Sequence, residues 1–85
     1  MKTLHVIRDP NERLALELAE RESERDTVSL LLIQDGVLAR PLSERVTLYV
    51  LADTTRACGV ADQSVVVDDN GAVRLIAEHD RVVVW

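Results

Sequence analysis

The strongest constraint on this sequence is one largely apolar segment in its first half. Residues Thr27 to Ile33 read TVSLLLI, and the last four of them are Leu or Ile in succession. A strand that faces water on one side alternates apolar and polar residues, whereas a strand buried on both faces is apolar throughout. The segment ends at Gln34-Asp35-Gly36, which has turn chemistry. It therefore predicts a central strand of a parallel sheet that is covered on both faces.

Shorter segments with strand and helix patterns alternate around this strand. Further strands are predicted at Thr3–Ile7, Val46–Ala52, Ser64–Val67 and Arg81–Trp85. Helices are predicted at Pro10–Arg25, Thr54–Cys58 and Ala72–Glu78, with a short helical piece inside Val37–Leu42. Such alternation requires right-handed crossovers and helices on both faces of the sheet. We expect one α/β domain over residues 1–85, a three-layer α/β/α arrangement with a mainly parallel five-stranded sheet of the flavodoxin-like kind.

The predicted helices are preceded by residues that are typical of helix N-termini. Asp9 is the expected N-cap of the first helix, with Pro10 at its first position and Glu12 placed to complete a capping box. The segment Asp68 to Gly71 reads as a turn that leads into the last helix. Asp68 and Asp69 form an acidic pair, but no other oxygen or nitrogen ligands converge on them in the sequence, so no metal site is predicted.

Charge and composition narrow the possible partners. The formal net charge is -5 and the basic residues are scattered, so direct binding to a phosphate backbone or to an anionic membrane surface is not expected. No segment approaches the roughly 20 apolar residues of a membrane span, and Met1 to Ile7 is too short for a signal peptide. With a single cysteine there is no intramolecular disulfide, and we expect a cytoplasmic protein.

Cys58 is the one residue with obvious covalent chemistry. It stands at the end of its predicted short helix, just before Gly59, where the helix dipole disfavours a thiolate. Two interpretations stay open: an inert, partly buried small side chain, or a thiol that carries sulfur. There is no Gly-rich phosphate loop, no nucleophile elbow and no paired cysteine motif. The residues alone therefore indicate no enzyme class and no cofactor.

Other candidates stand where predicted strands end. Asp35 and Gly36 follow one strand and Asp53 follows the next, and ligands of open α/β sheets bind at that edge. Their alternative roles are structural, with Asp35 capping a turn, Gly36 supplying a positive φ and Asp53 acting as an N-cap. His5 is expected to be a hydrogen-bonded core or interface residue.

The last predicted strand suggests that the chain associates with another. The sequence is 47% hydrophobic although it has only 85 residues, and its final segment is apolar and ends in Trp85, the single tryptophan. Tryptophan is enriched at interface hot spots, so Trp85 is a candidate interface residue. The alternative is that Trp85 folds back over Leu75 and Ile76 of the last helix. His79, near the end of that helix, is expected to be solvated.

Several segments together resemble the DsrEFH-like sulfur-relay family, in its DsrH/TusB branch. They are Thr3-Leu4-His5, then Leu32-Ile33-Gln34-Asp35-Gly36-Val37, then Leu48-Tyr49-Val50-Leu51 with Asp53 and Gly59, then Val73-Arg74-Leu75, and finally Trp85. Their order and spacing cover essentially the whole chain. No single one of these segments is specific, and the resemblance rests on their combination in a chain of this length.

The resemblance implies a small α/β subunit of an assembly that passes persulfide sulfur between proteins, toward tRNA wobble 2-thiouridine synthesis or in dissimilatory sulfur oxidation. Its partners would be DsrE/TusD-like and DsrF/TusC-like subunits. The sulfur-accepting cysteine of the DsrE/TusD type falls at about Leu51 here, and the first-helix cysteine of the DsrH type falls at about Glu20. Neither cysteine carries over, which favours a non-catalytic, TusB-like subunit. The alternatives are a persulfide carrier that uses Cys58 and a stand-alone homo-oligomeric binding protein.

Overall fold

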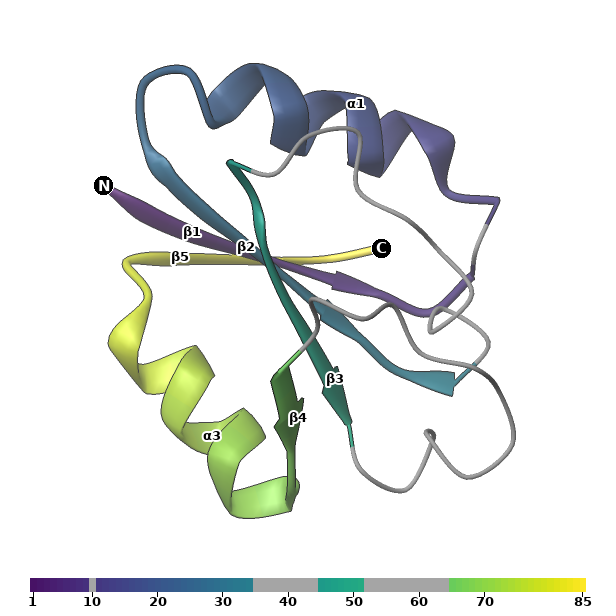
Figure 1. The fold of residues 1–85 in the computed structure, drawn as a ribbon, viewed down its shortest axis with the longest axis vertical. Helices are drawn as coiled ribbons and strands as arrows, with labels where there is room; N and C mark the ends of the chain where they lie inside the picture. The colour runs from purple at the N-terminus through teal and green to yellow at the C-terminus, as the bar shows by residue number, and fades with distance from the viewer. Residues whose placement is uncertain (10, 35–44, 52–64) are drawn as a thin grey trace.

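Five strands and two helices make up the described part of the chain (Figure 1). The structure, a computed structural model, describes residues 1–9, 11–34, 45–51 and 65–85. The strands are β1 (Lys2–Ile7), β2 (Thr27–Leu32), β3 (Thr47–Leu51), β4 (Val65–Val67) and β5 (Arg81–Val84). The helices are α1 (Arg13–Glu22) and α3 (Asp69–Glu78). At each described end, these strands lie within one residue of the predicted bounds, as is usual for element boundaries.

The strands form one sheet in the order β4-β3-β2-β1-β5, and all four neighbouring pairs are parallel. This confirms the predicted α/β fold with a parallel five-stranded sheet. The order differs from the 2-1-3-4-5 order of flavodoxin itself. Here the chain steps from β1 to β4 in one direction and then returns, through α3, to place β5 on the other side of β1.

The apolar segment that constrained the prediction lies in the middle of this sheet. β2 has β1 on one side and β3 on the other, and its residues Val28 to Leu32 are each at most 4% exposed. Burial on both faces is what the uninterrupted run of apolar residues predicted. The interior of the molecule is thus organised around β2.

Each face of the sheet has its own core, and in the described ranges α1 packs against one core and α3 against the other. His5, Leu30 and Leu48 are register partners on β1, β2 and β3, so their side chains share the face under α1. The buried apolar residues of that core are Ile7, Ala15, Leu16, Ala19, Val28, Leu30, Leu32, Val46, Leu48 and Val50. The opposite core contains Leu4, Val6, Leu31 and Leu75, with Ile33, Tyr49, Val67, Ala72 and Val82 packed against it. Helices α1 and α3 therefore cover opposite faces (Figure 1).

Helix α1 begins later than predicted, at Arg13 instead of Pro10. The Asp9 side chain accepts a hydrogen bond from the backbone N–H of Asn11, at 2.9 Å, in the manner of an Asx turn. This local bond competes with helix formation and keeps the preceding residues outside the helix. Glu12 occupies the N-cap position and makes no side-chain capping bond, so the predicted capping box is wrong.

Helix α3 begins earlier than predicted, at Asp69, because Asp68 is its N-cap. The Asp68 carboxylate accepts a hydrogen bond from the backbone N–H of Gly71, at 2.7 Å. The segment expected to be a turn is therefore the first turn of the helix. A Cβ at Gly71 would lie 3.0 Å from the Cβ of Val67, so a larger residue at this position would require the neighbouring Val67 to move by a few tenths of an ångström. The predicted helical segments Val37–Leu42 and Thr54–Cys58 lie outside the described residues.

Replacing the cap is expected to weaken the fold measurably. Asp68→Ala removes the acceptor for the Gly71 N–H and should cost about 1 kcal/mol of unfolding free energy. For a domain of this size such a loss lowers the melting temperature by roughly 4–8 °C. Glu78→Ala, at the other end of α3, is the matched control, because removing a carboxylate from the negative end of a helix should leave stability unchanged or slightly higher. Equal melting temperatures for Asp68→Ala and the unmodified protein would contradict the capping role.

Candidate functional site

The carboxyl edge of the sheet is where most predicted site residues fall in the sequence. Asp35 and Gly36 come shortly after the end of β2, and Asp53 shortly after the end of β3, and these two strands are parallel neighbours. Ligands of open parallel sheets bind at this edge. Asp35, Gly36, Asp53 and Cys58 all lie outside the described residues, so their convergence stays a prediction. Trp85 is the predicted site residue that the structure does place.

Trp85 is tied into its own domain by hydrogen bonds. Its indole Nε1–H donates to Nδ1 of His5 at 2.9 Å, and its backbone N–H donates to the carbonyl of Val6 at 3.0 Å. The guanidinium Nε–H of Arg8 donates to the carbonyl oxygen of Trp85 at 2.7 Å. The half-buried indole packs against the core under α1, on the face opposite Leu75, so it does not cover helix α3. Whether Trp85 also takes part in a subunit interface stays a prediction.

A continuous chain of hydrogen bonds runs through His5 and connects three elements. The His5 side chain is completely buried on β1, and its Nε2 lies 2.6 Å from Oε1 of Glu22 at the end of α1. The other carboxylate oxygen, Oε2, accepts a hydrogen bond of 3.0 Å from Arg81 on β5. We call this set, Trp85, His5, Glu22 and Arg81, the His5 network. It confirms the expectation that His5 is a hydrogen-bonded core residue.

The partners of His5 determine which of its nitrogens carries the proton. An indole N–H can only donate, so Nδ1 of His5 must accept and must be unprotonated. The proton of the neutral ring is therefore on Nε2, which donates to the Glu22 carboxylate. Both ring nitrogens are satisfied in this state, as a fully buried imidazole requires.

The second histidine has the opposite arrangement. Nδ1 of His79 lies 2.6 Å from the carbonyl oxygen of Leu75, which can only accept, so this nitrogen carries a proton. Nε2 of His79 lies 3.1 Å from the hydroxyl of Ser29, a buried polar residue of β2. His79 is half-buried by these contacts, so the prediction that it is solvated is wrong. The physical reason is that the hydroxyl of Ser29 needs a polar partner inside an apolar face.

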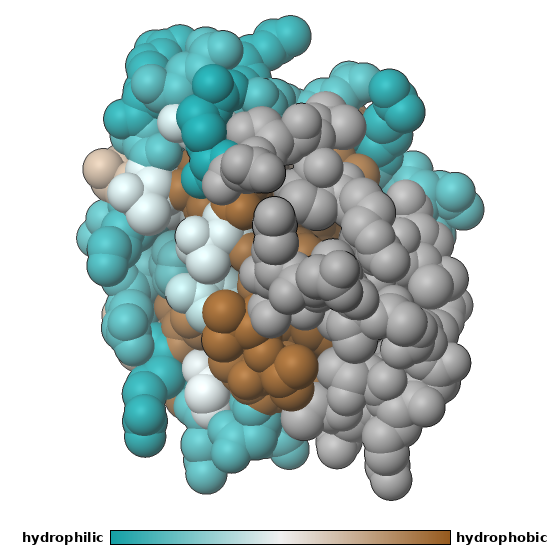
Figure 2. Space-filling model, in the orientation of Figure 1, coloured by the Kyte–Doolittle hydropathy of each residue, from teal (hydrophilic) through white to brown (hydrophobic). Residues whose placement is uncertain are grey.

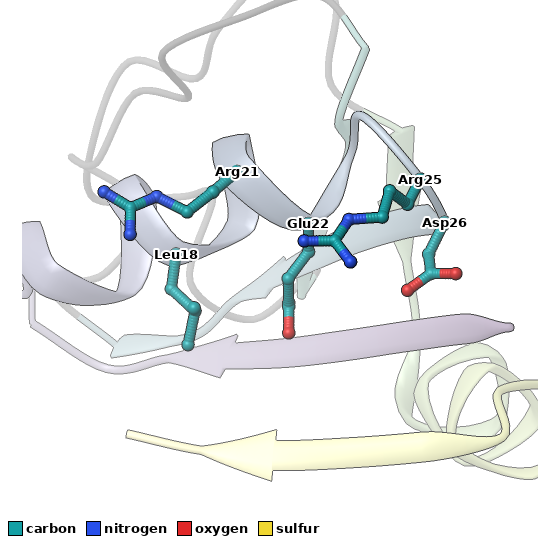
Figure 3. A pocket seen from close by; sticks show the side chains of 5 residues that line it. All are labelled: Leu18, Arg21, Glu22, Arg25 and Asp26. Atoms are coloured by element: carbon teal, nitrogen blue, oxygen red, sulfur yellow. The ribbon is translucent and has the colours of Figure 1, made fainter.

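A shallow surface depression lies beside the His5 network. It has a volume of about 420 Å³ and is lined by Leu18, Arg21, Glu22, Arg25 and Asp26 (Figure 3). Figure 3 shows the side chains of Leu18 and Glu22 pointing from α1 toward β1. Two cations and two carboxylates line this depression, so its charges balance and it selects neither anions nor cations. Within the described residues no group of histidine, cysteine or acidic side chains is placed to hold a metal ion.

A histidine bonded to a carboxylate has the composition of a general-base pair, but the surroundings of His5 prevent that use in this state. The unprotonated nitrogen of His5, Nδ1, already accepts a hydrogen bond from the indole of Trp85. Because the His5 side chain is also 0% exposed, no substrate can reach it in this state. The described part of the site is therefore a structural network and presents no reactive group.

The charged residues near the end of the first predicted helix are typical of a solvated, salt-bridged surface, so the sequence pattern misses the role of Glu22. They are Glu20, Arg21, Glu22, Glu24 and Arg25. The available signal was helical spacing: Ala15, Ala19 and Glu22 fall on one face of α1, and the first two are buried against the sheet. The Glu22 side chain is accordingly only 18% exposed. The pairing of Arg81 with Glu22 depends on β5 lying next to β1, which only the strand order reveals.

Removing the Glu22 carboxylate is expected to destabilise the protein. In Glu22→Ala the buried Nε2–H of His5 loses its acceptor, which should cost about 1–3 kcal/mol in the free energy of unfolding. Glu17→Ala is the matched control on the same helix, because Glu17 is exposed and its ion pair with the exposed Arg13 should contribute less than about 0.5 kcal/mol. Denaturant unfolding of both variants measures the difference. The same loss in the two variants would show that burial of the Glu22–His5 bond has no special weight.

Comparison with known proteins supports the fold. No protein-family model matches this sequence, and no curated protein matches it. Among solved structures, the crystal structure of the ychN protein from E. coli is similar over 100% of this chain and 99% of its own, with a TM-score of 0.71 and 17% sequence identity. A likeness at this level of identity concerns the fold, and it agrees with the five-stranded parallel α/β arrangement described above. In the described residues no helix is long and apolar enough to span a membrane.

Proposed function

We propose that this chain is a non-catalytic subunit of a cytoplasmic sulfur-relay complex, similar in role to the DsrH/TusB type of the DsrEFH-like family. The proposal is supported by the family resemblance of segments spread along the sequence and by the small parallel α/β domain that this resemblance implies. The likeness in fold to ychN over the full length of both chains is consistent with it.

The non-catalytic role is supported by the residues at the two positions where related subunits have a sulfur-carrying cysteine, because neither residue is a cysteine here. The position of the DsrE/TusD cysteine corresponds to about Leu51, which is the last described residue of β3. The position of the DsrH cysteine corresponds to Glu20 in α1, whose carboxylate is bonded to the guanidinium of Arg45 just before β3. One position thus has no nucleophile, and the other holds an ion pair between two elements.

Surface features support association with protein partners rather than with nucleic acid. Figure 2 shows hydrophilic side chains over α1 and a patch of apolar surface in the part of the view where Figure 1 places β4. On β4 and α3 four large apolar side chains are between 48% and 65% exposed: Val65, Val66, Val73 and Ile76. The formal net charge of -5 opposes direct contact with tRNA, which would be left to a partner subunit.

The partners are the first test of the proposal. We expect the tagged chain, purified at native expression level from its own cells, to bring with it DsrE/TusD-like and DsrF/TusC-like subunits that mass spectrometry identifies. Repeating the purification with untagged cells controls for adventitious binding. Recovery of this chain alone, as a self-associated species in sedimentation, would contradict the proposal and favour the stand-alone homo-oligomer.

The second test concerns Cys58, which would be the reactive residue if the chain carried sulfur itself. Because Cys58 is the single cysteine, a Cys58→Ser variant is expected to fold, to assemble and to support sulfur relay like the unmodified protein. Incubation with a cysteine desulfurase and cysteine, followed by mass spectrometry, should show no added sulfur atom on Cys58. An added sulfur there, together with loss of relay in Cys58→Ser, would favour the persulfide carrier.

A further inference from the structure

We propose that His5 is a proton-controlled latch for Trp85. In the described state the neutral imidazole holds the indole against the core under α1. A second proton on the ring would expel the indole from this place and free the end of β5. The latch is a property of the fold and is independent of the sulfur-relay role proposed above.

The physical basis is that only Trp85 can be the donor, and only His5 the acceptor, in the hydrogen bond between them. The indole N–H is a donor without acceptor capacity, and Nδ1 of His5 accepts from it at 2.9 Å. Protonation at Nδ1 would set two N–H groups against each other at that distance. Rotating the ring offers no escape, because both nitrogens of an imidazolium are donors. No orientation of the protonated ring can therefore keep this bond.

The charged groups around the ring direct the effect to Trp85 alone. From α1, the carboxylate of Glu22 faces Nε2 and would bond an imidazolium more strongly than a neutral imidazole. From β5, Arg81 shares this carboxylate and remains at hydrogen-bond distance from its other oxygen. The register partners of His5 on β2 and β5 are Leu30 and Val83, which carry no charge. Protonation therefore strengthens the contact with α1 and breaks the contact with Trp85.

Charges at greater distance from the ring do not offer Nδ1 a new acceptor in the described residues. Arg21, Arg25 and Asp26 line the depression that Glu22 also lines, and the hydrogen bond described for Nδ1 of His5 is with the indole of Trp85. Arg8 donates to the carbonyl oxygen of Trp85 and holds its backbone, not its indole. The indole N–H and Nδ1 of His5 are thus each other's partner in the network.

The end of β5 is the part of the sheet most able to respond. β5 is an edge strand of four residues with β1 as its one neighbour, and the side chain of Val84 next to Trp85 is 63% exposed. Besides the indole bond, two further hydrogen bonds hold this end: the backbone N–H of Trp85 donates to the carbonyl of Val6, and the side chain of Arg8 donates to the carbonyl oxygen of Trp85. Edge segments with few buried contacts open at low free-energy cost, so loss of the indole contact should release Trp85 to solvent while the inner strands stay paired.

His79 supplies an internal comparison. The hydroxyl of Ser29 can accept a hydrogen bond as well as donate one, so Nε2 of His79 can gain a proton without losing this partner. Nδ1 already donates to the carbonyl of Leu75 and continues to do so. The same chemical event, protonation of a histidine, thus leaves one network intact and breaks the other.

Trp85 fluorescence gives a direct readout because the chain has a single tryptophan. The full chain is titrated from about pH 8 to about pH 5, the range in which histidine side chains ordinarily change charge. We expect a red shift of the emission maximum and a gain in acrylamide quenching, both following the protonation of His5 seen in ¹⁵N-labelled imidazole spectra. At the start of the titration these spectra should show the proton of His5 on Nε2 and that of His79 on Nδ1. Far-UV circular dichroism should stay constant over the transition.

Three variants assign the transition. His79→Gln should keep it, whereas His5→Asn and His5→Gln should lose it, since neither carboxamide gains a proton in this range. His5→Asn retains an oxygen acceptor for the indole, and His5→Gln retains an N–H donor for Glu22, so the pair separates the two halves of the network.

Three results would overturn the latch: an unchanged emission maximum while the imidazole spectra show doubly protonated His5, the same red shift in His5→Asn, or a shift that coincides with loss of circular dichroism. If the His5 variants fail to fold, the comparison of fluorescence with imidazole spectra in the unmodified protein and in His79→Gln still decides.

Discussion

Burial of β2 on both faces is the constraint on which the rest of the structure depends. A strand that is apolar on both sides has to be covered twice, and in the described part of the chain α1 packs on one face of the sheet and α3 on the other. The one polar side chain in the buried part of β2, Ser29, makes a further demand on the fold. Its hydroxyl lies under the end of α3, where His79 provides the partner. The position of the last helix is thus fixed by both an apolar and a polar requirement of the same strand.

On the face of the sheet under α1, the buried side chain of His5 likewise depends on hydrogen-bond partners from other elements. A completely buried imidazole on β1 needs two partners of opposite kind, and it finds a carboxylate on α1 and an indole after β5. These partners are far apart in sequence and adjacent only because β5 joins the sheet beside β1. The two hydrogen bonds of the buried His5 imidazole therefore link the first strand, the first helix and the end of the last strand. They also fix the tautomer of His5 and the position of Trp85.

Most of the fold could be predicted from the sequence because its signals are local. The apolar run of β2 and the alternation of strands and helices led to the parallel sheet, and each described strand end lies within one residue of its prediction. The helix starts could not be assigned securely, because Asp9 and Asp68 are the same residue type with different outcomes: one closes an Asx turn and the other caps a helix. The His5 network was out of reach for a different reason. Its members meet through strand order, which a single sequence does not reveal. Four of the predicted site residues fall in segments outside the described ranges, so the sequence remains the basis for their roles.

The lengths of the strands have a consequence for the behaviour of the protein at high concentration. The inner strands β1 and β2 have six residues each, whereas the outer strand β5, which pairs with β1, has four. An exposed edge is a template on which another chain can add a strand, and long flat edges invite open-ended, fibre-like growth. The valine-rich strand β5 carries one charged residue, Arg81, and is too short to offer many backbone pairs. Its short length would therefore limit open-ended growth along this side of the sheet.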